Sequence, residues 1–109
     1  MFASIRRYRL RQGPIAELTR RVDESFAAEI SAQPGFGSYE FIDCGGDEIV
    51  TLSVFREAQQ AEASRELAQR WTEQNLGDFE FARIESLRGE ILVNRAAPDM
   101  LAPGHAATI

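Results

Sequence analysis

Apolar side chains recur at steps of three and four residues in the segment that follows Gly13 and Pro14. They form a single stripe on a helix, made up of Ile15, Leu18, Val22, Phe26 and Ile30. Pro14 suits the first position of such a helix, and Pro34 cannot continue it. The pattern predicts a helix of about five turns that ends at the Gln33-Pro34-Gly35 segment.

Three other segments have the composition and spacing of β-strands: residues 2–10, 36–43 and 49–55. The first has no cleanly apolar face, because several arginines interrupt it. The turn sequence Gly45-Gly46-Asp47 predicts a tight reversal between the second and third segments, so these two strands should be antiparallel neighbours. Residues 49–55 carry apolar side chains on both faces, which is typical of a strand covered on each side.

A second helix is predicted over residues 57–76 and ends before Gly77. Its inward side begins with small residues and ends with the bulky Leu67 and Trp71. Small residues either let a helix sit close to a sheet or leave room beside it, and the pattern does not decide between the two. Residues 89–95 are predicted to form the last strand, and residues 79–84 a short extended segment or loop.

The predicted order is strand, helix, strand, strand, helix, strand over residues 1–95, followed by a loose tail over residues 96–109. This is the order of the ferredoxin-like α+β fold, βαββαβ, a four-stranded antiparallel sheet with two helices on one face. The other face of the sheet also carries apolar side chains, and no third helix is predicted to cover it. A patch of that kind is typical of an interface, so we expect a homodimer that packs sheet to sheet.

The composition restricts the partners and the chemistry. At 109 residues the chain suits one domain, and its net charge of −5 argues against nucleic acid or an anionic membrane as a partner. Cys44 and His105 are each the only residue of their type, so no intrachain disulfide can form and no cysteine-based metal site is complete. No apolar run has the length of a signal peptide or of the roughly 18 residues of a membrane span. A cytoplasmic protein is therefore expected.

Four segments carry a further signal: RYRLRQGPIAELTRRVDE, QPGFGSYEFI, IVTLSVFREAQQAEAS and GEILVNR. Together they resemble the antibiotic biosynthesis monooxygenase-type family of dimeric α/β barrels. The resemblance extends over residues 2–95 and rests on the order of a strand, a glycine, a helix, Pro-Gly-Phe and a strand pair. It contains no catalytic signature. It implies the ferredoxin-like fold and a homodimer formed through the sheet face.

The resemblance also implies an activity, the oxidation of a small aromatic or polyketide-like molecule by O2 without metal, flavin or other cofactor. The pocket of such enzymes lies between the second helix and the sheet. The residues here that suit such a pocket are Trp71 and Asn75 on the helix, Tyr39 on the second strand, and Tyr8 and Arg6 on the first. Arg6 or Asn75 would stabilise a phenolate or enolate that gives an electron to O2. Arg6, Tyr39, Trp71 and Asn75 are therefore the candidate catalytic residues.

Each of these residues also has a purely structural interpretation. Trp71 can anchor the core, Asn75 can terminate the helix, the two tyrosines can lie at a rim, and Arg6 can belong to a solvated strand. Two other functions remain open: a non-catalytic homodimer that binds a small hydrophobic ligand, and an interaction module of a larger enzyme. Relatives that degrade haem bind iron through a His on the second helix, where this chain has none. Haem breakdown is therefore disfavoured.

Overall fold

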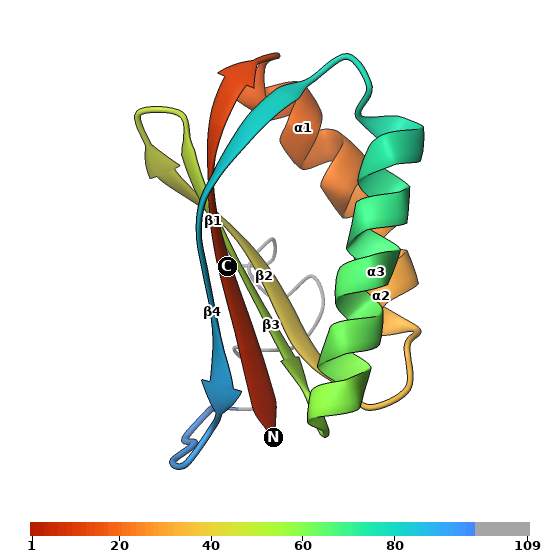
Figure 1. Cartoon of the computed structure of the whole chain (residues 1–109), viewed down its shortest axis with the longest axis vertical. Helices are drawn as coiled ribbons and strands as arrows, with labels where there is room; N and C mark the ends of the chain where they lie inside the picture. The colour runs from red at the N-terminus through yellow and green to blue at the C-terminus, as the bar shows by residue number, and fades with distance from the viewer. Residues whose placement is uncertain (98–109) are drawn as a thin grey trace.

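The computed structural model describes residues 1–97, which form one sheet and two long helical segments (Figure 1). The strands are β1 (Phe2–Gln12), β2 (Phe36–Gly45), β3 (Glu48–Phe55) and β4 (Glu80–Glu90). The helical elements are α1 (Ile15–Arg21), the π-helical turn η1 (Val22–Phe26), α2 (Ala27–Ser31) and α3 (Ala58–Asn75).

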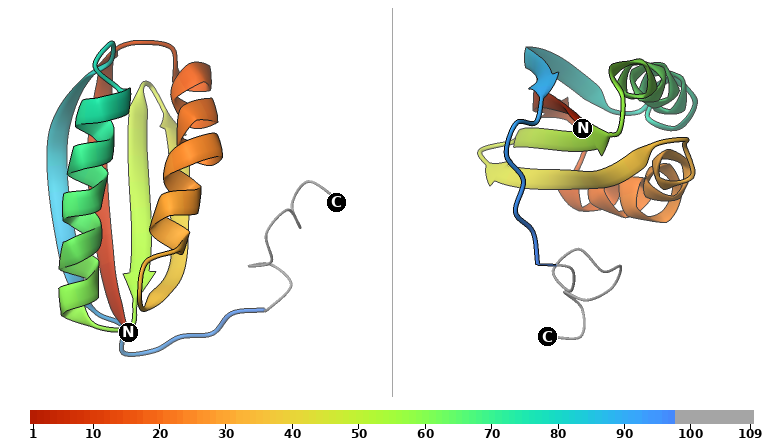
Figure 2. Two further views of the ribbon diagram at one scale, coloured as in Figure 1. Left: turned by 90° about the vertical axis from the view of Figure 1, so that its right-hand side faces the viewer. Right: turned by 90° about the horizontal axis from the view of Figure 1, so that it is seen from below.

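The strands lie in the order β2-β3-β1-β4, and every neighbouring pair is antiparallel. All the helices lie on the same face of this sheet (Figure 2). α2 packs on β2, whereas α3 packs on β1 and β3. This is the ferredoxin-like α+β arrangement, so the predicted fold is confirmed.

The first three helical elements form one continuous helix, since the backbone stays helical at Val22 and Ala27, where they join. The predicted single helix is therefore confirmed, and its apolar stripe is buried except for the partly buried Ile15. The middle turn, η1, is π-helical. Turns of this kind occur frequently at functional sites, and Ser25 within this one contacts α3.

The last strand differs from the prediction. β4 spans Glu80–Glu90, so most of the segment 79–84 belongs to a strand, and residues 91–95 belong to none. The length of β1 is the reason: its first residue, Phe2, pairs with Glu90, and no β1 residue remains to pair with the chain beyond. The predicted last strand exists, but its position over residues 89–95 is wrong beyond Glu90. The apolar run in residues 89–95 is the stronger pattern for a strand, but Leu92 within it is 87% exposed. β4 lies at the edge of the sheet, a position that tolerates charged residues.

The sheet face opposite the helices is apolar at its centre. Ile5 lies between Leu52 on β3 and Leu87 on β4, and all three side chains point away from the helices. No element within residues 1–97 covers this outer face, and Leu87 is 54% exposed. Towards one end the face becomes charged, where Arg7 pairs with Glu48 at 3.0 Å.

The loop that leads into β2 allows a test of how the N-terminus of α3 is held. Gly35 has a φ of +77°, and a Cβ there would overlap the side chain of Gln60. The Gln60 Oε1 accepts the backbone N–H of Glu57 at 3.0 Å and so caps α3. Gly46 has a φ of +60°, and a Cβ at this residue would meet no other atom within 4 Å, so it offers a matched control.

We expect Gly46→Ala to cost about 1 kcal/mol of unfolding free energy, because only the left-handed backbone is penalised. Gly35→Ala should cost roughly 1–2 kcal/mol more, because it also displaces the cap of α3. Urea unfolding followed by circular dichroism measures both. Equal costs for the two variants would contradict the capping role of Gln60.

Candidate functional site

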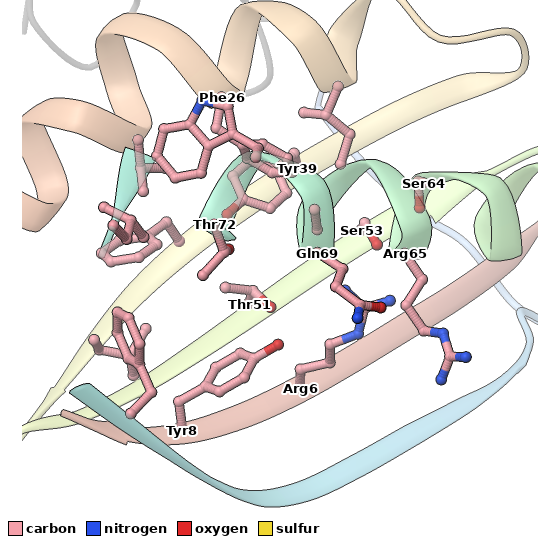
Figure 3. Close-up of a pocket in the computed structure, with 18 of the residues that line it drawn as sticks. Arg6, Tyr8, Phe26, Tyr39, Thr51, Ser53, Ser64, Arg65, Gln69 and Thr72 are labelled. Carbon is pink, nitrogen blue, oxygen red and sulfur yellow. The ribbon is translucent and has the colours of Figure 1, made fainter. Parts of the chain in front are cut away.

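A cavity of about 500 Å³ lies between the helices and the sheet, a size within the range of small-molecule sites. Every strand and both long helical segments contribute to its lining. It exists because the inward residues of β1 and β3 include short polar side chains, among them Ser4, Thr51 and Ser53, where larger residues would fill the space. Figure 3 shows the side chains that project into it.

One half of the cavity is aromatic. The ring of Phe26 lies 5.3 Å from that of Trp71 and 5.3 Å from that of Tyr39, measured between centroids. Trp71 is only 5% exposed, and its indole Nε1 donates a hydrogen bond to the Ser25 Oγ at 2.9 Å. Trp71 is therefore both a core residue and a wall of the cavity, so the structural and the pocket interpretation of this residue are both correct.

The other half is polar and centres on Arg6. This residue is turned inward by the alternation of β1, opposite Thr51 on β3 and Ser86 on β4. It is only 8% exposed, its buried Nε has no hydrogen-bond partner, and it takes part in none of the ion pairs between described residues. Figure 3 shows Arg6 and Tyr8 rising from β1 towards Gln69 of α3. A buried guanidinium without a counter-charge is suited to an anion.

Tyr39 is held as a neutral phenol. Burial raises the pKa of its hydroxyl, and the nearby Tyr8 raises the pKa further, while the positive charge of Arg6 lowers it by a smaller amount. The Tyr39 hydroxyl therefore keeps its proton at neutral pH and can donate a hydrogen bond to a ligand oxygen.

The cavity opens between α3 and β4. Its exposed lining residues all come from these two elements: Arg65, Gln69 and Glu73 from α3, and Arg83 from β4. Of the residues that line the cavity, Glu73 alone carries a carboxylate. The mouth is thus lined by more positive than negative charge, although the chain as a whole is acidic.

The structure brings together Arg6, Tyr8, Tyr39 and Trp71 but not Asn75. Asn75 is exposed, is absent from the lining, and donates its side-chain N–H to the carbonyl of Trp71 at 3.0 Å. Its placement in the pocket is corrected: it follows Trp71 by one turn at the end of α3, and its side chain bonds back to the helix backbone instead.

Sequence reasoning missed several polar lining residues. The sequence did not identify Thr51 and Ser53 as lining residues, because both faces of β3 carry apolar side chains. The pattern therefore did not show which set of side chains turns towards the helices. Arg65 and Gln69 lie four residues apart and are followed by Thr72 and Glu73, so they form one polar ridge beside Trp71. That i,i+4 spacing was the available signal.

Within residues 1–97, no group of three or more His, Cys, Asp or Glu side chains is placed to hold a metal ion. None of the helices in the same part of the chain is long and apolar enough to cross a membrane.

No protein-family model and no curated protein matches the chain. Solved structures do match. A candidate antibiotic biosynthesis monooxygenase from Chloroflexus aurantiacus is 20% identical, with a TM-score of 0.67 over 87% of this chain and 96% of that one. A single-residue mutant of SnoaB, a cofactor-independent oxygenase from Streptomyces nogalater, is 14% identical, with a TM-score of 0.65 over 85% and 94% of the two chains.

The chain shares its fold with antibiotic biosynthesis monooxygenases. A dimeric ferredoxin-like protein from an uncultured marine organism matches equally well, with 14% identity and a TM-score of 0.67 over 88% of this chain and 98% of that one. The resemblance to this family is thus confirmed in the fold. At such identities the likeness establishes the fold alone.

The hydrogen bond between Ser25 and Trp71 can be tested with a double-mutant cycle. Ser25→Ala should cost about 1–2 kcal/mol of unfolding free energy, because the buried indole N–H loses its acceptor. In a Trp71→Phe background, which lacks that N–H, the same change should cost close to nothing. The cycle cancels the difference in helix propensity between Ser and Ala. Additive effects in urea unfolding, followed by circular dichroism, would contradict the coupling.

Proposed function

We propose that the protein is a cofactor-independent monooxygenase that oxidises a small aromatic or polyketide-like molecule with O2. The observation that carries this proposal is the buried Arg6, unpaired among the described residues, in a cavity whose other half is aromatic. The fold that the chain shares with SnoaB supports it. The planar body of the substrate would lie against Phe26 and Trp71, and its acidic oxygen would face Arg6.

The chemistry requires an electron-rich anion. Glu73 at the mouth would accept the proton of a phenol or of a carbon acid, and Arg6 would stabilise the resulting phenolate or enolate. The anion gives one electron to O2, and the substrate radical combines with the superoxide to form a peroxide anion on carbon, which takes back the proton that Glu73 accepted. Loss of water from a peroxide at a CH2 carbon leaves a carbonyl, so one oxygen atom enters the product and the other leaves as water.

Each side chain has a separate role in this scheme. The guanidinium of Arg6 acts in a water-poor site, where its attraction to a negative charge is stronger than it would be in bulk water. Tyr39 and Tyr8 offer hydroxyl donors to the same oxygen or to a neighbouring one. Trp71 positions the ring system, and Ser25 holds the indole in place.

A second candidate is a non-catalytic protein that binds a small ligand in the same cavity. It is favoured by one observation, that the carboxylate among the lining residues lies at the exposed mouth and not beside Arg6. Binding then needs only the aromatic wall and the buried cation. Turnover distinguishes the two candidates.

The assembly that we propose is a homodimer through the outer face of the sheet. Ile5, Leu52 and Leu87 would be buried between two copies, and no element within residues 1–97 covers them in a single chain. The solved ferredoxin-like protein that matches this chain is described as dimeric, which supports the proposal. Two sheets that pack face to face would form the α/β barrel expected from the sequence.

The activity can be tested with anthrone-like polycyclic phenols in air. We expect O2 uptake and, with isotopically labelled O2, one labelled atom in the product. Arg6→Gln should lower turnover by roughly 10²–10³-fold, because the donor that stabilises the anion is lost. Arg70→Gln is the matched control, since Arg70 is an exposed arginine of α3 outside the lining. Saturable quenching of Trp71 fluorescence with no O2 uptake would contradict the oxygenase and favour the binding protein.

The dimer can be tested by placing a charge on the outer face. Leu52→Glu and Leu87→Glu should shift the protein to monomers in sedimentation equilibrium, because two sheets cannot bury carboxylates without partners. Leu87 is half-exposed in a single chain, so the second variant should fold as well as the wild type. Ala63→Glu adds the same charge to an exposed position of α3 and should leave the dimer intact. Folded dimers of both sheet variants would overturn the interface.

A further inference from the structure

A second cavity adjoins the first and takes no part in the function proposed above. It measures about 210 Å³ and lies between β1, β4 and the start of α3. Four arginines and one carboxylate line it: Arg6, Arg65, Arg83, Arg88 and Glu62. We call it the arginine annex. Its lining therefore carries a formal charge of +3, in a chain whose net charge is −5.

The annex is open space because the residues around it are small. The exposed Ala58 and the buried Ala61 line it from the first turn of α3, and Ser4 of β1 and Ser86 of β4 line it from the sheet. The sequence left undecided whether these small residues bring the helix close or leave room. The structure shows that they leave room.

The annex and the aromatic cavity share part of their lining. Arg6, Arg65, Arg83 and Ser4 line both. A molecule whose ring system lies in the large cavity would therefore reach the annex past these four side chains.

The positive charge of the annex is only partly neutralised. Glu62 pairs with Arg65 at 3.2 Å and also with Arg88. Neither Arg6 nor Arg83 takes part in the ion pairs between described residues, and the buried Nε of Arg6 has no hydrogen-bond partner there. Two guanidinium groups thus have donors to spare, and one of them is more than nine-tenths buried.

We propose that the annex binds a carboxylate carried by the aromatic ligand on a short arm. Guanidinium groups match the planar fork of a carboxylate and bind it through paired N–H donors. The aromatic body occupies the cavity beside Trp71, and the carboxylate enters the annex between Arg6 and Arg83. The proposal rests on the proposed function only in that both concern the same ligand; it requires binding and no turnover.

A pair of ligands that differ only in charge tests this. Anthracene acetate and anthracene acetamide have the same ring system and arm, and both quench the single Trp71 through the same chromophore. Titration under nitrogen removes any contribution from turnover. We expect the acid to bind at least about tenfold more tightly than the amide, and the difference to shrink as salt is added.

Variants locate the carboxylate. Arg83→Gln should weaken binding of the acid several-fold and binding of the amide by much less, so that the preference for the acid shrinks. Arg83 is exposed on an edge strand and takes part in no ion pair between described residues, so this variant should fold normally. Arg70→Gln serves as the control, because Arg70 is an exposed arginine of α3 that lines neither cavity.

The result that overturns the proposal is equal affinity for acid and amide, tested with benzene, naphthalene and anthracene as the ring system. Binding by no member of these pairs counts as the same result. A preference for the acid without O2 uptake on any phenol would support the carboxylate site in the annex and contradict the oxygenase activity. O2 uptake on a neutral substrate without a preference for the acid would support the oxygenase activity and contradict the carboxylate site in the annex.

Discussion

The alternation of strand β1 determines what the cavity contains. This strand pairs with β3 on one edge and with β4 on the other, so the direction of each side chain is set twice. A slip of one residue would turn Arg7 inward in place of Arg6 and would move the buried Leu10 into water. The inward position of Arg6 is therefore a consequence of register. Its desolvation is unfavourable, and the apolar contacts of the surrounding core must offset it.

Those apolar contacts are concentrated where the two long helices meet over the sheet. Phe26 lies against both Trp71 and Tyr39, and the Trp71–Ser25 hydrogen bond joins α3 to the π-helical turn. Arg21 makes a second link on the surface, where its guanidinium binds Asp78 and lies 4.9 Å from the centroid of Phe79. Exposed ion pairs of this kind contribute little to stability. The aromatic contacts therefore hold the helices in place, and Arg21 orients the loop that leads into β4.

The two ends of α3 give the two halves of the site their different chemistry. Small residues such as Ala58 and Ala61 at its start leave the arginine annex open, and Trp71 near its end closes the aromatic half. A ligand that fits both halves has a flat apolar body and an acidic group at one end. The same arrangement serves oxygenation or binding alone, because an anion held beside Arg6 is the common requirement.

The sequence by itself determined the order of the elements, the long first helix and the fold, because periodicity and the Gly and Pro residues at the element ends are local properties. The stripe from Ile15 to Ile30 sufficed to define that helix. Only the tertiary structure decided that β4 ends at Glu90, that Arg6 turns inward and that Asn75 stays outside the cavity. These features depend on pairing and packing between residues far apart in the chain, and no local pattern of apolar and polar positions contains that information.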